Sequence, residues 1–279
     1  MSRPFTYALA VAFCFLVSGL AHAVIVEVTP ATPDDWTWHV TNSTGTIGTG
    51  SGTADFVLGP GTPPLGDGSF NLMTPAGGGN QSAQLRYSGA AGIRIDELTS
   101  LSYSTYATDW NGSQLPYLTI WLDLDGNGTR DDRLWFEPTY SRAAAGNGNP
   151  NPQADPVLNA WQTWDALDGM WYADTAAGPG SNAITLAAYL ALPGKANATI
   201  INDTAQNIGG IRIASGFASA ANNFNAYVDN FTIGTASGVT TFNFELAPIP
   251  EVNAAALFGL AAVIAGIGAK ICRRSRTGA

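Results

Sequence analysis

Ala226-Tyr-Val-Asp-Asn-Phe-Thr-Ile233 is the stretch that decides the fold class of this chain. Successive side chains of a β-strand point to opposite faces of the sheet, so a half-buried strand alternates with period two. The stretch has that alternation, and it predicts two sets of side chains on opposite faces: Val228, Asn230 and Thr232 on one, and Tyr227, Asp229, Phe231 and Ile233 on the other.

Similar short runs follow one another along residues 24–247, separated by Gly, Pro, Asn and Asp. The expected strands are 24–28, 36–40, 54–57, 81–87, 101–105, 118–122, 133–136, 211–214, 226–233 and 240–244. Long loops are expected at 59–79 and 143–156, and only residues 181–192 approach a helical pattern. Strands at this spacing, without helices between them, predict one all-β domain over 24–247, an antiparallel and jelly-roll-like β-sandwich.

The composition excludes several classes of function. The 279 residues contain 12 Lys and Arg against 21 Asp and Glu, a net charge of −9, so the chain would repel a phosphate backbone and we expect no nucleic-acid partner. Two His and two Cys leave little for a transition-metal cluster or a Cys/His nucleophile. Cys14 and Cys272 both lie outside 24–247, so the predicted domain has no disulfide.

The first 23 residues predict a secretory signal peptide. Arg3 supplies a charged start, an apolar run follows to about Leu20, and Ala21-His22-Ala23 is a small-x-small cleavage site. We expect cleavage after Ala23. The alternative, a retained N-terminal anchor, is less favoured because the run is short for a membrane-spanning helix.

The last 32 residues, 248–279, predict a membrane-anchoring tail. Pro250-Glu251-Val252 precedes an uncharged run from Ala254 to Ala269, and Lys270 can extend it to a transmembrane helix of about 254–272. Basic residues close the chain: Arg273, Arg274 and Arg276. They predict a cytoplasmic C-terminus, with the bulk of the protein on the other side of the membrane.

This order of a Pro-Glu element, a short apolar helix and an arginine cluster resembles the PEP-CTERM sorting signal, although Val252 stands where the usual motif has proline. The resemblance covers Pro250 to Arg276. It implies an exosortase-type enzyme as partner and a Gram-negative host. It also implies transient anchoring in the inner membrane, followed by delivery to the cell surface or to the exopolysaccharide matrix.

The loop that starts at Asp123 reads Asp-Leu-Asp-Gly-Asn-Gly-Thr-Arg-Asp-Asp. Oxygen-bearing side chains at alternate positions, with glycines that permit a tight turn, suit a hard cation such as Ca²⁺. The spacing resembles Ca²⁺ loops in β-hairpins of integrin-type repeats, which implies side-chain ligands at Asp123, Asp125, Asn127 and Asp131 and a carbonyl ligand at Thr129. The alternative is a solvated hairpin turn, which favours the same residues.

Six of the eight tryptophans lie between residues 110 and 171. Planar rings beside carboxylates and amides allow extracellular modules to stack on sugars, and Trp161, Trp164 and Trp171 are the candidates here. Trp161 and Trp164 are three positions apart and cannot share one strand face. Trp121 is expected to point inward, and for any single tryptophan a place in the core is the commoner outcome.

Glu137, Asp165 and Asp168 could supply the acid and base of a glycoside hydrolase. A Ser/His/Asp triad has only His39 available after signal cleavage, and no G-x-S-x-G motif is present. We therefore expect no enzymatic activity, with glycoside hydrolysis as the one enzyme class considered.

The run from Leu115 to Tyr172, together with YVDNFTIG and TFNFE near the end, looks like a family of uncharacterised secreted bacterial β-sandwich proteins. The sequence thus predicts an exported, C-terminally sorted surface or matrix protein, stabilised by Ca²⁺ and non-catalytic. The alternative is a carbohydrate-binding module, and a glycoside hydrolase is less favoured.

Overall fold

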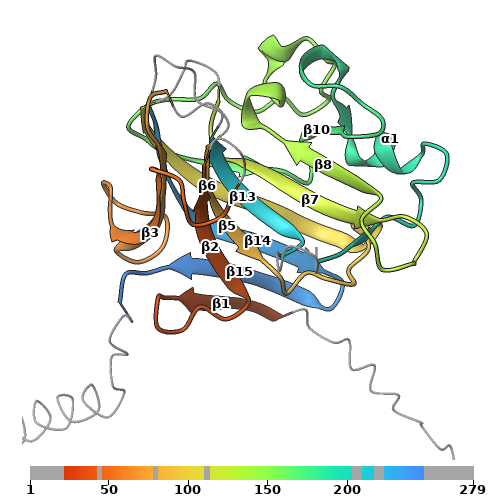
Figure 1. The fold of residues 1–279 in the computed structure, drawn as a ribbon. Helices are drawn as coiled ribbons and strands as arrows, with labels where there is room; N and C mark the ends of the chain where they lie inside the picture. Colours follow the sequence, from red (N-terminus) through yellow and green to blue (C-terminus); the bar gives the residue numbers. More distant parts are fainter. Residues whose placement is uncertain are drawn as a thin grey trace, which may run out of the picture.

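A computed structural model describes residues 22–42, 46–77, 81–109, 114–202, 209–216 and 223–247, which form two β-sheets (Figure 1). The seven-stranded sheet contains β1 (His22–Val28), β15 (Gly238–Phe244), β14 (Phe224–Thr235), β4 (Gly68–Thr74), β3 (Thr53–Leu58), β6 (Leu98–Asp109) and β9 (Trp161–Asp165). The eight-stranded sheet contains β11 (Ile184–Thr185), β10 (Met170–Ala173), β8 (Asp132–Phe136), β7 (Tyr117–Asp123), β13 (Ile211–Gly216), β5 (Ser82–Tyr87) and β2 (Trp36–Thr41), with β12 (Thr199–Ile200) beside β7. Apart from 3₁₀ turns, α1 (Leu186–Leu190) is the helix of the described residues, so the predicted all-β class is confirmed.

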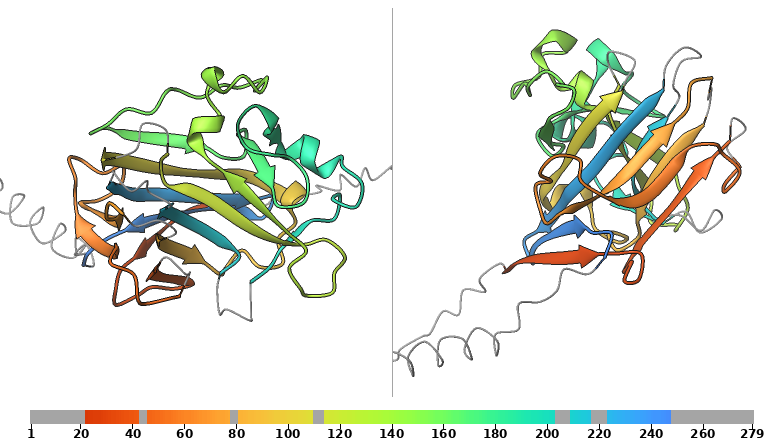
Figure 2. Two further views of the ribbon diagram at one scale, coloured as in Figure 1. Left: turned by 45° about the horizontal axis from the view of Figure 1, so that its top comes forward. Right: turned by 90° about the vertical axis from the view of Figure 1, so that its left-hand side faces the viewer.

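The two sheets pack face to face through one hydrophobic core, as the two views of Figure 2 illustrate. Trp36 on β2 meets three phenylalanines of the opposite sheet edge-on, with ring centroids 5.3 Å from Phe231, 5.3 Å from Phe242 and 5.0 Å from Phe244. Edge-to-face contacts of this kind suit the charge distribution of aromatic rings. This core between two sheets agrees with the predicted β-sandwich.

A β-bulge in β14 changes the alternation predicted for its sequence. The register of β14 against β6 shifts between Asp229 and Thr232, and Asn230 has a left-handed backbone with φ of 57°. The extra residue at the bulge brings Val228 and Phe231 into the same core, although strict alternation predicts opposite faces for them. The prediction was wrong because period two holds only while each residue has one partner on the neighbouring strand.

The loop expected at 59–79 contains a strand of the sheet interior. β4 lies between β3 and β14, and its Phe70 and Leu72 side chains are fully buried in the core. Flanking glycines and prolines hid this strand in the sequence. The second expected loop, 143–156, has only a 3₁₀ turn at Ala143–Ala145 among its regular elements.

The sheets are antiparallel except at β1, which pairs in parallel with β15 along the lower edge of the molecule in Figure 1. The predicted cleavage after Ala23 falls inside β1 and leaves the pairs from Val24–Thr240 to Val28–Phe244 in place. Residues 1–21 and 248–279, with the predicted sorting motif and transmembrane helix, lie outside the described residues. None of the helices that the structure describes has the length and apolar character needed to cross a bilayer.

Candidate functional site

Three aromatic side chains form a row on the outward face of the seven-stranded sheet. Tyr227 of β14 pairs with Tyr106 of β6, and Tyr106 pairs with Trp161 of β9. Ala107, next to Tyr106, and Val228, next to Tyr227, point into the core, as does Trp164, three positions after Trp161, so the row points away from it. We call Tyr227, Tyr106 and Trp161 the aromatic row.

All three rings of the aromatic row are half-buried, which leaves part of each open to solvent. The Tyr106 ring centroid lies 5.6 Å from that of Trp161 and 6.2 Å from that of Tyr227. The indole Nε1 of Trp161 donates to the carbonyl oxygen of Pro60 at 2.9 Å, which fixes the orientation of the ring. The row is therefore a pre-arranged apolar surface.

Amide and hydroxyl groups surround the aromatic row. The Asn71 Nδ2 donates to Asn225 Oδ1 at 2.8 Å, and Asn225 Nδ2 donates to Thr108 Oγ1 at 2.9 Å. On the other side, the hydroxyls of Ser104 and Thr163 lie 2.8 Å apart. Aromatic rings combined with such polar groups can stack on a ligand ring and hydrogen-bond its hydroxyls.

The structure places only one of the three predicted sugar-binding tryptophans on a surface. Trp164 is 1% exposed and its Nε1 donates to Thr105 Oγ1 at 2.7 Å, while Trp171 is fully buried and its Nε1 donates to the Ala166 carbonyl at 2.8 Å. Both indoles fill the core, so the expectation that they contact a sugar is corrected. Trp161 lies on the opposite face of β9 from Trp164, as their three-residue spacing requires.

The outward face of the eight-stranded sheet carries a cluster of arginines and aromatic rings that the sequence reasoning missed. One row runs across five strands, in the order Arg86, Arg212, Thr119, Trp135 and Tyr172. The rings of Trp135 and Tyr172 are stacked, 2° from parallel with centroids 5.8 Å apart. The available signal was an arginine set between two large apolar or aromatic residues in each strand: Arg86 between Leu85 and Tyr87, and Arg212 between Ile211 and Ile213.

Trp121 also lies on this outward face, contrary to expectation. Its neighbours Ile120 and Leu122 on β7 fill the core, so alternation turns the indole of Trp121 away from it. The indole is nevertheless 3% exposed, and the guanidinium carbon of Arg86 lies 5.1 Å from its ring centroid.

The Asp123 loop brings three of its predicted ligands together. Ligand oxygens of Asp123, Asp125 and Asp131 all lie within 4.8 Å of one another. Backbone amides also bind the loop carboxylates: Gly128 N donates to Asp123 Oδ2 at 2.7 Å, and Leu124 N donates to Asp131 Oδ2 at 2.8 Å. The hydrogen bond from Gly128, with others from the loop backbone, lowers the pKa of Asp123 and favours its charged form.

The other two predicted ligands complete the turn. Asn127 Oδ1 accepts a hydrogen bond from the Thr129 amide at 2.7 Å, and the Asn127 amide donates to Asp125 Oδ1 at 3.1 Å. These contacts are those of a tight polar turn, which the loop forms by itself. The clustered oxygens could hold a hard cation. The same hydrogen bonds are also those of a hairpin turn without an ion.

The three carboxylates considered for hydrolysis belong to different surroundings. Glu137 follows β8 and is 9% exposed, and its Oε1 accepts from the Tyr172 hydroxyl at 2.6 Å; burial raises its pKa. Asp165 and Asp168 are exposed at the turn between β9 and β10, where the Asp168 amide donates to Asp165 Oδ1 at 3.1 Å. The two aspartates thus form a local turn contact.

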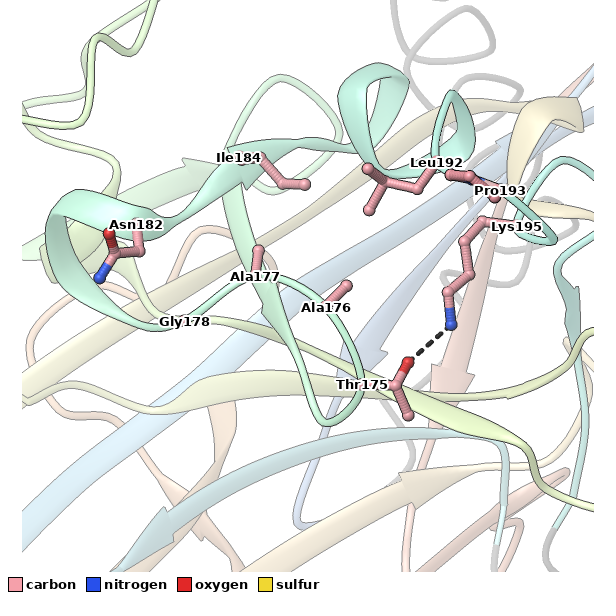
Figure 3. A pocket seen from close by; sticks show the side chains of 9 residues that line it. All are labelled: Thr175, Ala176, Ala177, Gly178, Asn182, Ile184, Leu192, Pro193 and Lys195. Atoms are coloured by element: carbon pink, nitrogen blue, oxygen red, sulfur yellow. Dashed lines mark hydrogen bonds between the residues drawn. The ribbon is translucent and has the colours of Figure 1, made fainter.

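A pocket of about 630 Å³ opens beside β10, β11 and the segment after α1, and Figure 3 shows its lining. Ile184 and Leu192 contribute apolar surface, and Lys195 contributes the charged group. The Lys195 Nζ donates to Thr175 Oγ1 at 2.6 Å and to Asp132 Oδ2 at 2.7 Å. Because Asp132 holds the ammonium, this lysine serves first to tie the 175–195 segment to β8.

Comparison with known proteins gives no family. No known protein family and no curated protein matches the chain. Among solved structures, it is similar to SGBP-B from a complex xyloglucan utilization locus in Bacteroides uniformis, at 13% identity and a TM-score of 0.30, over 66% of this chain and 46% of that chain. It is also similar to the binding domain of botulinum neurotoxin DC in complex with SialylT, at 14% identity and a TM-score of 0.24, over 74% of this chain and 48% of that chain.

The chain therefore spans about half the length of these structures. Likenesses of this size carry no argument about what this protein binds.

Proposed function

We propose that this protein is an exported β-sandwich that binds carbohydrate without catalysis, through the aromatic row of the seven-stranded sheet. The observation that carries the proposal is the placement of Tyr227, Tyr106 and Trp161 side by side on three neighbouring strands, half-exposed and bordered by Asn71 and Asn225. Rings on neighbouring strands can each contact a successive sugar of a polysaccharide chain.

The rigidity of the row supports the same function. Trp161 is held by Pro60, and the border amides Asn71 and Asn225 are held by each other and by Thr108, so little side-chain freedom is lost when a ligand binds.

Replacing Trp161 by alanine is expected to weaken binding to neutral polysaccharide about tenfold or more, because Trp161 has the largest ring of the row and truncation of a tryptophan hot spot costs about 2 kcal/mol or more. The measurement is affinity electrophoresis of the full chain against dextran, a mixed-linkage β-glucan and galactomannan. A wild-type chain that is folded and retarded by none of them would remove the carbohydrate role and leave a structural surface protein.

The matched control is Trp135→Ala, which truncates another half-buried strand tryptophan on the opposite outward face. It should leave binding to these neutral polymers unchanged. Equal losses in both variants would show that the effect is general destabilisation and would contradict the assignment to the aromatic row.

The hydrolase alternative has its own test. Release of reducing sugar by wild type, lost in Glu137→Gln with the fold intact, would establish a glycoside hydrolase instead of a non-catalytic binding protein.

Calcium stabilisation of the Asp123 loop belongs to the same proposal. Asp123, Asp125 and Asp131 present clustered carboxylates, with Asn127 and the Thr129 carbonyl as the further ligands that the sequence predicts. Ca²⁺ that binds the folded state is expected to raise the melting temperature by mass action, and chelator should reverse the shift. Calorimetry of wild type and Asp125→Asn tests this; no shift at millimolar Ca²⁺ would leave a polar hairpin turn.

Export and sorting complete the proposal. The signal peptide ending at Ala23, the Pro250-Glu251-Val252 element and the apolar run before Arg273, Arg274 and Arg276 support transient anchoring in the inner membrane and processing by an exosortase-type enzyme. Release to the cell surface or matrix would bring the aromatic row to exopolysaccharide, its proposed ligand.

A further inference from the structure

A second polar site lies on the outward face of the eight-stranded sheet, away from the aromatic row. Arg86 of β5 and Arg212 of β13 are direct cross-strand neighbours there, at 4% and 7% exposure. Two like charges in directly opposed positions repel each other. Burial also lowers the pKa of Arg212. The protein thus buries two neighbouring cations.

Aromatic rings hold the two guanidinium groups in place. The Arg212 guanidinium carbon lies 5.5 Å from the Tyr117 ring centroid and 5.3 Å from that of Trp135. Its Nη2 donates to Thr119 Oγ1 at 2.8 Å. On the neighbouring strand, the Arg86 Nε donates to Gln84 Oε1 at 2.9 Å. Both side chains are therefore oriented before any ligand arrives.

This face has more hydrogen-bond donors than acceptors. Three buried donor atoms make no hydrogen bond within the described part of the chain: Arg212 Nε, the Tyr117 hydroxyl and Trp121 Nε1. Buried donors are nearly always paired, to protein or to water. Tyr117 and Trp121 lie four residues apart on β7, about 13 Å along the strand, so one ligand carboxylate could reach Arg212 Nε but not both of the other two donors. The carboxylates nearby are already engaged, since Asp174 pairs with Arg133 at 3.1 Å and Glu137 accepts from Tyr172.

No carboxylate of the described residues forms an ion pair with Arg212. A planar guanidinium matches a carboxylate with two parallel hydrogen bonds, and the adjoining rings of Tyr117 and Trp135 suit the apolar face of a sugar. We propose that this face is a second binding site, specific for the carboxylate of an acidic saccharide of the uronate class, with Arg212 as its principal ligand-binding residue.

The unpartnered donors are closed to bulk water, so the ligand reaches them when a half-buried neighbour turns aside. Trp135 is that neighbour, because it is half-buried whereas Tyr117 is 5% exposed. Its movement would break the stacking on Tyr172 and the hydrogen bond from its Nε1 to Asp174 Oδ1 at 3.2 Å. The site is independent of the aromatic row, which belongs to the other sheet. If one site did not bind its ligand, binding at the other site would be unchanged.

The test compares an oligogalacturonate with the neutral galactose oligomer of the same length, by titration calorimetry on the full chain. We expect the acidic oligomer to bind at least about tenfold more tightly, with an affinity that falls as salt is added, because the ion pair is screened. Arg212→Lys, which keeps the charge but loses the planar fork, should weaken acidic binding about tenfold. Arg94→Lys, at an exposed arginine elsewhere, is the control and should change nothing.

Equal affinity for the acidic and neutral oligomers, or no binding of the acidic oligomer by folded wild type, would overturn the proposal. So would undiminished acidic binding by Arg212→Lys. If that variant does not fold, the comparison of the two oligomers on wild type decides alone. Acidic binding that persists in Trp161→Ala would further separate this site from the aromatic row.

Discussion

Replacing Asp132 by alanine is expected to destabilise the protein by about 3 kcal/mol, because it leaves a buried ammonium without its counter-charge. The Asp132 side chain is fully buried, and its Oδ2 accepts from Lys195 Nζ at 2.7 Å and from the Tyr189 hydroxyl at 2.7 Å. Burial alone would raise the pKa of Asp132, but the hydrogen bonds from Lys195, Thr175 and Tyr189 outweigh it and lower the pKa. Urea unfolding followed by tryptophan fluorescence measures the loss.

The matched control is Asp96→Ala, which breaks the exposed ion pair with Arg94. Its effect on the free energy of unfolding should be small, because solvent screens an exposed pair. The double variant Asp132→Leu, Lys195→Met should recover part of the loss, since no charge is then left buried. A loss in Asp132→Ala no larger than in Asp96→Ala would show that the network is not a stabilising element.

Replacing Trp36 by alanine is expected to cost about 3–5 kcal/mol, the range for removing a large aromatic side chain from a core. Trp36 is 1% exposed and joins the sheets through Phe231, Phe242 and Phe244. Chemical denaturation of the variant checks the value.

Trp36→Phe separates ring packing from the indole N–H. The Nε1 of Trp36 is buried without a hydrogen-bond partner in the described structure, so its removal should carry no penalty of a lost bond. We therefore expect Trp36→Phe to lose much less stability than Trp36→Ala. Equal losses would indicate that the core depends on the full indole volume.

Residue patterning predicted the class of fold but not the surface that carries the candidate site. The β-rich runs at 118–122 and 226–233 correctly indicated strands. The pattern could not identify β4, because glycines and prolines on both sides of Phe70 and Leu72 gave the segment the composition of a loop, although it pairs with β3 and β14 in the sheet. A strand depends on its partners, which are distant in sequence.

The tryptophans show the same limit for the site. Three-residue spacing required Trp161 and Trp164 to lie on opposite faces, but it did not say which of the two faces the core. Pairing of β9 with β6 made that choice, bringing Trp164 beside Tyr103 in the core and Trp161 beside Tyr106 outside. Tyr106 and Tyr227 could not be recognised as partners of Trp161, because the three rings come from three strands that are separate in sequence.

Local patterns therefore predict many of the strands and the acidic Asp123 turn, since each depends on residues adjacent in the chain, and they also predict the character of the two ends, which lie outside the described residues. Only the tertiary structure decides which face of each strand is buried, where the bulge at Asn230 reverses the alternation, and how Arg86 and Arg212 become neighbours. Those features depend on strand register and on the opposing sheet. Strand register depends on contacts between segments that are distant in sequence, so the local pattern of apolar residues does not determine it.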